Sequence, residues 1–370
     1  MHKTFKYRLY PTKRQAETLG FHLDLCRELY NAAIQERRDA WKITRVSVGF
    51  NQQAAQLSEI KSDRPEVASV YSQVLQDVLR RVDKNFQAFF RRVKIGGAPG
   101  FPRFRPASRY DSLTYPQLGF ALETNRLKLS KIGHIKIKLH RAVEGKIKTL
   151  TLKREAGRWY ACFSVACGTK LLAESPEVIG IDVGLTTFAT LSDGTEIGNP
   201  RHYLEAQAQL RKGQRKVARR KKGSHRRRKA IRLLQRAHAH VRNQRSDFHH
   251  KASRSLVERY GFIAVEDLNI KGLASGMLAK SINDASWSSF IAKLAYKAEE
   301  AGRVLVKVDP RGTSQTCLCG ASVPKTLSQR WHQCDQCGLS APRDHVSAQV
   351  ILGLGLSLQA PTWPVAACVA

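Results

Sequence analysis

Acidic residues are scarce in this chain of 370 residues, which carries 30 Asp and Glu against 63 Lys and Arg. The resulting formal net charge of +33 opposes a compact state by self-repulsion, so stability alone does not explain it. A polyanionic partner would offset this charge, and nucleic acid is the commonest polyanion. An anionic membrane surface is the rival partner.

Long apolar runs are also missing. The most apolar stretch, 350–360, is too short to span a bilayer, and the first residues are polar and basic, unlike a signal peptide. These absences predict a cytoplasmic, nucleoid-associated protein with no membrane partner. In a reducing cytosol, the eight cysteines are expected to be metal ligands or buried thiols rather than disulfides.

The first 170 residues are predicted to combine helices with antiparallel strands. A short strand at 5–10 precedes a capping-box pattern at 12–15, where a helix should begin. Apolar residues at helical spacing predict another helix over 65–94. From 118 to 168 the apolar pattern has a period of two, which predicts a small antiparallel barrel.

The rest of the chain is predicted to mix strands and helices. Apolar runs at 178–183, 262–266 and 304–308 read as strands, and Asp284 is expected to cap the helix that bears Trp287. Between the first two strands, Arg211 to Lys251 holds 17 Lys or Arg and a single acid. A helical hairpin so dense in like charges would be destabilised without counter-anions, which favours contact with nucleic acid.

A second candidate for nucleic-acid contact is the segment 101–105, where aromatic residues alternate with arginines. Rings can stack on the bases of a single strand while guanidinium groups contact its phosphates. An ordinary linker is the alternative reading of this segment. The residues expected to contact nucleic acid are Arg103, Phe104, Arg105, Arg219, Arg220, Lys221, Lys222, Arg226, Arg227 and Arg228.

Three carboxylates far apart in the sequence are the candidate catalytic residues. Asp182 and Glu266 end apolar strands, and Asp344 begins the last predicted helix. Each has a simpler alternative. Asp182 could be a turn residue, Glu266 a solvated strand end and Asp344 a helix N-cap. Together they suit a pair of Mg²⁺ ions, with Mn²⁺ as a substitute, that hydrolyse a phosphodiester. Asp267 adjoins Glu266 but is expected to face the opposite side of the strand.

Four cysteines near the end of the chain are the candidate ligands of one structural Zn²⁺ ion. They are Cys317, Cys319, Cys334 and Cys337. The second pair has the usual C-x-x-C spacing of a zinc ribbon, whereas the first pair is one residue short. His332 is a possible substitute ligand, and buried thiols without metal are the alternative reading.

Taken together, these motifs resemble the TnpB family, the OrfB proteins of bacterial insertion-sequence transposons and relatives of type V CRISPR effectors. The resemblance covers nearly the whole chain. It rests on the segments 7–11, 100–104, 180–184, 265–268, 281–287, 314–338 and 343–344.

The resemblance implies an α/β fold combined with a β-barrel and helical parts. The implied domains are a wedge-type β-barrel (1–10 and 107–172), a helical recognition domain (11–106), an RNase H-like RuvC nuclease domain (173–312 and 339–360) with a basic helical segment (205–255), a zinc ribbon (313–338) and a C-terminal tail (361–370).

The resemblance also implies the partners. These are a guide RNA from the transposon end and double-stranded target DNA, cut beside a transposon-adjacent motif by a protein that is monomeric on its RNA. The third nuclease motif departs from the family, because Pro342 and Val346 stand where it usually has Asp and Asn. Two alternatives therefore stay open: a nuclease-weakened RNA-guided DNA-binding regulator, and a transposase or junction nuclease that needs no RNA.

Overall fold

The computed structural model describes residues 2–326 and 328–359, and the chain divides after Gly168 into two compact units of mixed α/β structure. Each unit has its own sheet and its own core. The predicted C-terminal tail, 361–370, lies outside the described residues.

Unit 1 is built on an antiparallel sheet of seven strands in the order β2-β6-β7-β1-β5-β4-β3. The four residues 116–119 join the two edge strands, and such a linker reaches at most about 18 Å. A flat sheet of this size would separate its edges by about 29 Å, so the sheet must curl strongly. Its strands are β1 (His2–Tyr10), β2 (Ser112–Tyr115), β3 (Phe120–Leu122), β4 (Arg126–Leu129), β5 (Gly133–Lys138), β6 (Lys146–Glu155) and β7 (Arg158–Ala166).

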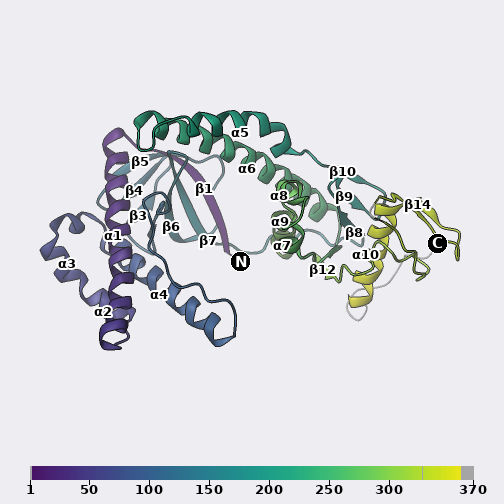
Figure 1. Ribbon diagram of the computed structural model, residues 1–370, viewed down its shortest axis with the longest axis horizontal. Helices are drawn as coiled ribbons and strands as arrows, with labels where there is room; N and C mark the ends of the chain where they lie inside the picture. Colours follow the sequence, from purple (N-terminus) through teal and green to yellow (C-terminus); the bar gives the residue numbers. More distant parts are fainter. Residues whose placement is uncertain (1, 327, 360–370) are drawn as a thin grey trace. The chain divides into compact units, whose positions relative to one another are not determined.

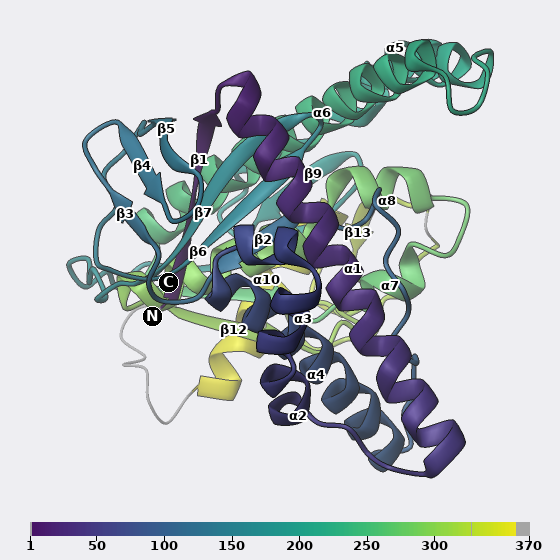
Figure 2. The ribbon, with the colours of Figure 1, turned by 90° about the vertical axis from the view of Figure 1, so that its left-hand side faces the viewer.

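Helices α1 and α4 of unit 1 pack against each other and against the sheet edge at β2 (Figure 2). The predicted capping box is present, since the Thr12 hydroxyl accepts from the Gln15 N–H and the Gln15 side chain accepts from the Thr12 N–H. None of the described helices is both long and apolar enough to cross a membrane. The helices of unit 1 are α1 (Lys13–Thr44), α2 (Phe50–Ala55), α3 (Leu57–Asp63), the 3₁₀ turn η1 (Pro65–Ser69) and α4 (Ser72–Lys94).

The predicted continuous helix over 65–94 is wrong, because the chain interrupts it before Ser72. Val70 and Tyr71 have extended backbones between η1 and α4. That conformation buries Val70 to 2% exposure and stacks the Tyr71 ring on Tyr115, with 5.8 Å between ring centroids. Tertiary packing therefore overrides the helical pattern here.

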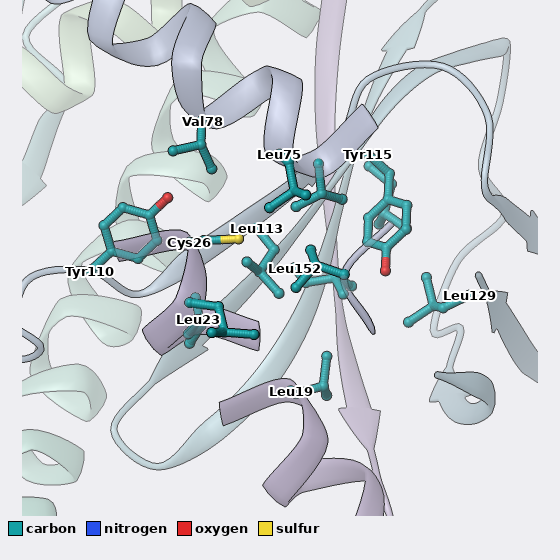
Figure 3. Packing of buried hydrophobic residues seen from close by; sticks show 14 of the residues in the cluster. Leu19, Leu23, Cys26, Leu75, Val78, Tyr110, Leu113, Tyr115, Leu129 and Leu152 are labelled. Atoms are coloured by element: carbon teal, nitrogen blue, oxygen red, sulfur yellow. The ribbon is translucent and has the colours of Figure 1, made fainter. Parts of the chain in front are cut away.

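The core of unit 1 fills the space between α1, α4 and the strands (Figure 3). Leu19 and Cys26 point inward from α1, and Leu75 comes from α4. Leu113 and Leu152 meet them from β2 and β6. The apolar residues at helical spacing in α4 are thus used for packing as far as Phe86, whereas Val93 near the end of the helix is exposed.

Unit 2 has a five-stranded sheet in the order β10-β9-β8-β11-β12. Strand β11 is parallel to both β8 and β12, whereas β9 and β10 are antiparallel additions. The elements are β8 (Val178–Val183), β9 (Thr187–Leu191), β10 (Glu196–Gly198), α5 (His202–Ala218), α6 (His225–Arg259), β11 (Phe262–Glu266), α7 (Ile270–Leu273), α8 (Ala279–Ala285), α9 (Trp287–Ala301), β12 (Val304–Val308), β13 (Trp331–Gln333), β14 (Ser340–Pro342) and α10 (Arg343–Gln359).

Helices cover both faces of this sheet. Ile263 and Val265 of β11 join a core with α6 and α9, while the alternate residues Phe262 and Ala264 pack with Ile351 of α10. Figure 1 shows α10 beside β8, at the end of the unit where β14 lies. Because side chains alternate between the two faces of a strand, a residue two positions after Ala264 also faces α10.

Glycine permits α10 to lie unusually close to the sheet. A Cβ added at Gly180 of β8 would sit 2.1 Å from the carbonyl oxygen of Ala348 and 2.8 Å from the Leu352 backbone nitrogen. A Cβ at Gly355 would sit 2.6 Å from the Cβ of Ala264. The helix thus approaches β8 backbone to backbone, and these two contacts fix its height above the sheet.

Helices α5 and α6 form the predicted basic hairpin, and they lie side by side in Figure 1. Gly223 turns the chain with a positive φ, and Ser224 caps α6. The expected role of Asp284 is wrong. Its carboxylate accepts from the Tyr203 N–H at 2.9 and 3.0 Å and from Arg245 at 2.8 Å, so it caps α5 rather than the helix that begins at Trp287.

We expect Gly180→Ala to destabilise unit 2, because two of the three atoms that crowd the new methyl group belong to the backbone of α10 and the third is the Cβ of Leu352. Overpacking of this kind costs about 1–3 kcal/mol, and more where the backbone cannot shift. Urea unfolding followed by tryptophan fluorescence measures the loss. Gly198→Ala, in β10 of the same sheet with nothing within 4 Å of its new Cβ, is the control. Equal losses for the two variants would contradict the account.

Candidate functional site: a carboxylate cluster and a cysteine cluster

Asp182 and Glu266 lie side by side at the ends of β8 and β11. The parallel register pairs Ala264 with Gly180 and Val265 with Ile181, and its continuation sets Glu266 beside Asp182. Adjacent strands are about 4.8 Å apart, so the two side chains are neighbours. Asp182 lies two residues after Gly180, and Glu266 lies two residues after Ala264. Both side chains therefore project on the face of the sheet that α10 covers.

Asp344 reaches these two acids from the first turn of α10. It precedes Ala348 by four residues, or about 6 Å along a helix. Asp182 follows Gly180 by two residues, which is about 6.6 Å along a strand. Ala348 contacts Gly180, and Asp344 and Asp182 lie at nearly equal distances from that contact, so Asp344 is brought toward Asp182. We call Asp182, Glu266 and Asp344 the carboxylate cluster.

The electrostatics of the carboxylate cluster show that its members interact. Burial raises the pKa of Asp182 well above its usual range, and the charges of Glu266 and Asp344 raise it further, against a smaller opposing effect of Arg343. Burial also raises the pKa of Glu266. Negative charges gathered in a partly buried place are costly unless cations neutralise them, and oxygen ligands of this kind suit Mg²⁺.

Thr313 is a residue of the site that the sequence reasoning missed. It is 3% exposed, and its hydroxyl lies 2.5 Å from Oε1 of Glu266 and 3.1 Å from the Pro310 carbonyl oxygen. The hydroxyl donates to Glu266 and lowers the pKa of that carboxyl against the effect of burial. It thereby fixes one oxygen of Glu266. Its distance of 47 residues from Glu266 leaves no signal in a single sequence.

Asp267 stands apart from the carboxylate cluster. Its side chain is exposed and accepts from Nζ of Lys307 at 2.9 Å. The backbone N–H of Asp267 donates to the Val308 carbonyl, so it prolongs the ladder with β12. The two adjacent acids therefore have different surroundings, and they offer a matched pair for mutagenesis.

Cys317, Cys319, Cys334 and Cys337 converge, and we call them the cysteine cluster. All four Sγ atoms lie within 4.8 Å of one another. The Cys317–Cys337 and Cys319–Cys334 sulfur distances are 3.5 and 3.7 Å. A tetrahedral zinc with bonds of about 2.3 Å would set its sulfurs about 3.8 Å apart, so the cluster has the size of a zinc site. The shortened first pair does not prevent convergence.

The backbone around the cysteine cluster also suits thiolates. The N–H groups of Cys337 and Gln336 point at Cys334 and lower its pKa to about 7. His332, the possible substitute ligand, is buried nearby and meets Lys325 through Nδ1, but it is not a member of the group. Among the residues that the structure describes, these four cysteines are the only group of three or more His, Cys, Asp or Glu whose ligand atoms all lie within 4.8 Å of one another, so the oxygens of the carboxylate cluster do not all lie that close together.

The residues expected to contact nucleic acid are divided between the two units. Arg103, Phe104 and Arg105 are exposed on the segment that follows α4 in unit 1. The other seven lie in the turn of the α5–α6 hairpin and the first turn of α6; five of these are exposed, while Arg220 and Arg227 are half-buried. Arg227 donates to the Arg220 carbonyl at 3.3 Å and closes the turn, so its role is at least partly structural.

A cleft of about 380 Å³ opens in unit 2 next to the chain that leaves Asp182. Leu185 and Thr186 form one wall, shortly after the end of β8. The start of α5 and helix α8 supply the others, including the cations Arg201 and Lys280. The two cations are suited to contact phosphate, while Asp284 is the one acid of the lining and none of the three carboxylates belongs to it.

Family models match three parts of the chain. One described as "Helix-turn-helix domain" covers residues 1–45, the OrfB model "Probable transposase" covers 165–276, and "Cas12f1-like, TNB domain" covers 287–351. In the structure the first range is strand β1 followed by the single helix α1. The other two contain Asp182, Glu266, Asp344 and the cysteine cluster.

Known proteins are similar over nearly the whole length. A Streptomyces pristinaespiralis protein named "Putative RNA-guided DNA endonuclease" is 35% identical over 97% of this chain and 90% of its own. An Escherichia coli K12 protein of that name, InsQ, is 28% identical over 95% and 92%. The solved mini-RNA-guided endonuclease CRISPR-Cas_phi3 has a TM-score of 0.50 at 10% identity, covering 95% of this chain and 92% of that one, which shows a likeness of fold.

We expect Asp182→Asn to stabilise the metal-free protein at pH 8. An unfolded Asp has a pKa of about 3.9, and the folded value is raised, so the native wild type carries an ionisation penalty above the folded pKa. This penalty is absent below the pKa of the unfolded state. The stability that the variant gains over the wild type should therefore shrink as the pH falls toward 4. Thermal unfolding at both pH values tests this. Equal stability of variant and wild type at pH 8 would show that ionisation of Asp182 costs the folded protein no free energy.

We expect the purified protein to hold one zinc ion and to lose it in Cys334→Ser, because three thiolates bind zinc less tightly than four. Inductively coupled plasma mass spectrometry gives the stoichiometry. Cys167→Ser is the control, since this thiol belongs to unit 1 and its bond to the Glu144 carbonyl can be made by a hydroxyl. Full zinc content in Cys334→Ser would remove the cysteine cluster as the zinc site.

Proposed function

The chain belongs to the TnpB family of OrfB-type transposon proteins, and from this premise we propose that it is an RNA-guided, metal-dependent DNA endonuclease. Membership of a family whose relatives are named DNA endonucleases makes this chain a DNA endonuclease. The catalytic residues, the metal ions and the guide are the parts that we propose.

The observation that carries the proposal is the convergence of Asp182, Glu266 and Asp344. The sheet register sets Asp182 and Glu266 side by side. The close contact of α10 with Gly180 brings Asp344 toward them. The charges of Glu266 and Asp344 raise the pKa of Asp182 beyond the effect of burial, which supports their proximity to it. Three acids gathered in a chain of net charge +33 are best explained by divalent cations.

In this proposal the carboxylate cluster would hold two Mg²⁺ ions, or Mn²⁺ in their place, which when bound supply Lewis acidity for phosphodiester hydrolysis. Thr313 would keep one oxygen of Glu266 occupied, and so direct the other toward the centre of the cluster. Arg201 and Lys280 in the neighbouring cleft would hold the phosphates of the strand to be cut. The cysteine cluster would hold a structural Zn²⁺ ion.

We assign the finer architecture on the same basis. Unit 2 would be an RNase H-like RuvC domain, supported by its mixed sheet with parallel β8 and β11 and by acids at the strand ends. The curled sheet of unit 1 would be the wedge-type barrel, with α1 to α4 as the recognition insert. The domain bounds given above remain our predictions.

The partners would be a guide RNA from the transposon end and double-stranded DNA beside a transposon-adjacent motif, bound by a monomer near the bacterial nucleoid. The names of the similar proteins support RNA guidance and DNA cleavage. The exposed arginines of the α5–α6 hairpin and of the segment 103–105 supply the charge that such partners need. Base pairing would read the sequence, and the protein would read shape and the adjacent motif.

The alternatives differ from this proposal in what they require. A regulator that binds without cutting would fit the altered third motif, where Pro342 and Val346 replace the usual Asp and Asn. Yet all three acids are present, so cleavage is favoured. A transposase or junction nuclease would act without RNA.

We expect Glu266→Gln to abolish cleavage and Asp267→Asn to leave it within about threefold of wild type. The first variant loses a member of the carboxylate cluster, whereas the second loses only the exposed pair with Lys307, which is worth little. The assay uses ribonucleoprotein purified from cells that carry the gene with its native 3′ flank, and a plasmid that matches that flank.

The same preparation separates the alternatives. RNA should copurify with both variants, and ribonuclease treatment should abolish cutting by the wild type. Cutting that survives ribonuclease would favour the RNA-independent nuclease. Binding of the plasmid without cutting, by wild type and variants alike, would favour the regulator.

A further inference from the structure

We propose that unit 1 holds a preformed pocket for one unpaired nucleotide of a nucleic-acid strand. The pocket is a groove between α1, α4 and the segment 100–112, and we call it the arginine groove. It consists of two adjoining cavities of about 300 and 220 Å³ that share Tyr30, Asn85, Arg105 and Arg109 in their walls. The proposal rests on the proposed function only in taking nucleic acid as the ligand.

The loop that forms one wall of the groove is held in place before any ligand binds. The side chain of Asn31 on α1 accepts from the Arg105 N–H at 2.8 Å and donates to the Arg105 carbonyl at 3.1 Å. Proline stands at 102 and at 106, and Phe101 packs edge-on against Phe86 with 5.6 Å between centroids. An ordinary linker would need none of these contacts, and a preorganised wall lowers the entropic cost of binding.

The charge of the groove points to phosphate. The larger cavity is lined by four arginines and no acid: Arg92 from α4, and Arg103, Arg105 and Arg109 from the loop. The smaller adds Arg81 and Lys84, with Asp111 as its one acid. Like charges from two elements that face the same space repel one another, so a bound polyanion would relieve the repulsion. Arg81 is partly engaged, since it donates to Ser112.

The aromatic side chains of the groove point to a base. Phe104 keeps 46% of its surface exposed, with the Arg38 guanidinium 5.4 Å from the ring centroid. Tyr30 lines both cavities, and its hydroxyl accepts from Nδ2 of Asn85 at 2.8 Å. An exposed ring among arginines is the arrangement that holds bases of single strands, by stacking and phosphate contact together.

The size of the groove limits the ligand to an unpaired nucleotide. A cavity of about 300 Å³ lies at the lower end of the range for small-ligand sites, roughly 300–1,000 Å³. A base that is stacked and paired in a duplex cannot leave its neighbours without loss of that pairing. The phosphate and base chemistry is shared by two sources, an unpaired nucleotide of the guide RNA and one of a DNA strand, and only a test can separate them.

Photo-crosslinking tests the proposal without cleavage. The full chain, with no added Mg²⁺, is mixed with a 12-nucleotide strand that carries one 5-iodouracil, made as RNA and as DNA, and the adduct is mapped by mass spectrometry. We expect an adduct at Phe104 or Tyr30 that disappears when the strand is annealed to its complement. An adduct with RNA alone assigns the guide as the source, and one with DNA alone assigns a DNA strand. Adducts only outside the groove would overturn the proposal.

Affinity measurements separate base recognition from charge. Phe104→Leu should weaken binding of the single strand about tenfold, the loss expected for one stacked base, while Phe104→Tyr should retain it. Neither variant should change binding of an abasic 12-mer of equal charge. Arg92→Ala should weaken single-strand binding more than Arg91→Ala, which removes the same charge from α4 outside the groove.

Equal effects of Phe104→Leu on normal and abasic strands would reduce the groove to a general cation surface and overturn the proposal. The outcome is independent of the carboxylate cluster. Loss of cleavage together with a retained adduct would refute the proposed nuclease mechanism alone, and normal cleavage without an adduct would refute the pocket alone.

Discussion

Everything at the carboxylate cluster depends on how closely α10 approaches the sheet of unit 2. A side chain at Gly180 would push the helix away, because its Cβ would meet the Ala348 carbonyl at 2.1 Å. The second contact, between Gly355 and Ala264, holds the other end of the helix close to the sheet as well. Asp344 lies in the first turn of this helix, so two glycines determine where its carboxylate lies.

The carboxylate cluster illustrates a conflict between stability and function. Burial and like charges raise the pKa of Asp182, which means that ionising it costs the folded protein free energy. A fold selected for stability alone would not gather acids there; at Glu266, the Thr313 hydroxyl only partly offsets the rise in pKa that burial causes. In the proposed function, divalent cations would resolve this conflict, and bound polyanions would offset the positive charge on the surfaces of both units.

Much of this could be predicted from the sequence. The strands at 178–183 and 304–308 carry apolar runs, the capping box at Thr12 is local, and cysteine spacing is visible at once, so each agrees with the structure. Acids after buried strands could be singled out as well, since polar residues in such places are rare. These features are local in sequence or follow from composition.

The errors and omissions share a different physical cause. Val70 and Tyr71 interrupt a helical pattern because they pack against partners elsewhere in unit 1, and Asp284 caps α5 from 81 residues away. Thr313 and the arginine groove also depend on contacts between distant segments. Propensity and periodicity describe the neighbours of a residue along the chain, so contacts of this kind appear only once the fold is known.

The most direct test of the central claim is anomalous diffraction from crystals of the protein grown with Mn²⁺. We expect two manganese peaks about 4 Å apart, with Asp182, Glu266 and Asp344 as their protein ligands. Manganese bound only at other acids, such as Asp267, or an empty carboxylate cluster at saturating metal, would contradict it.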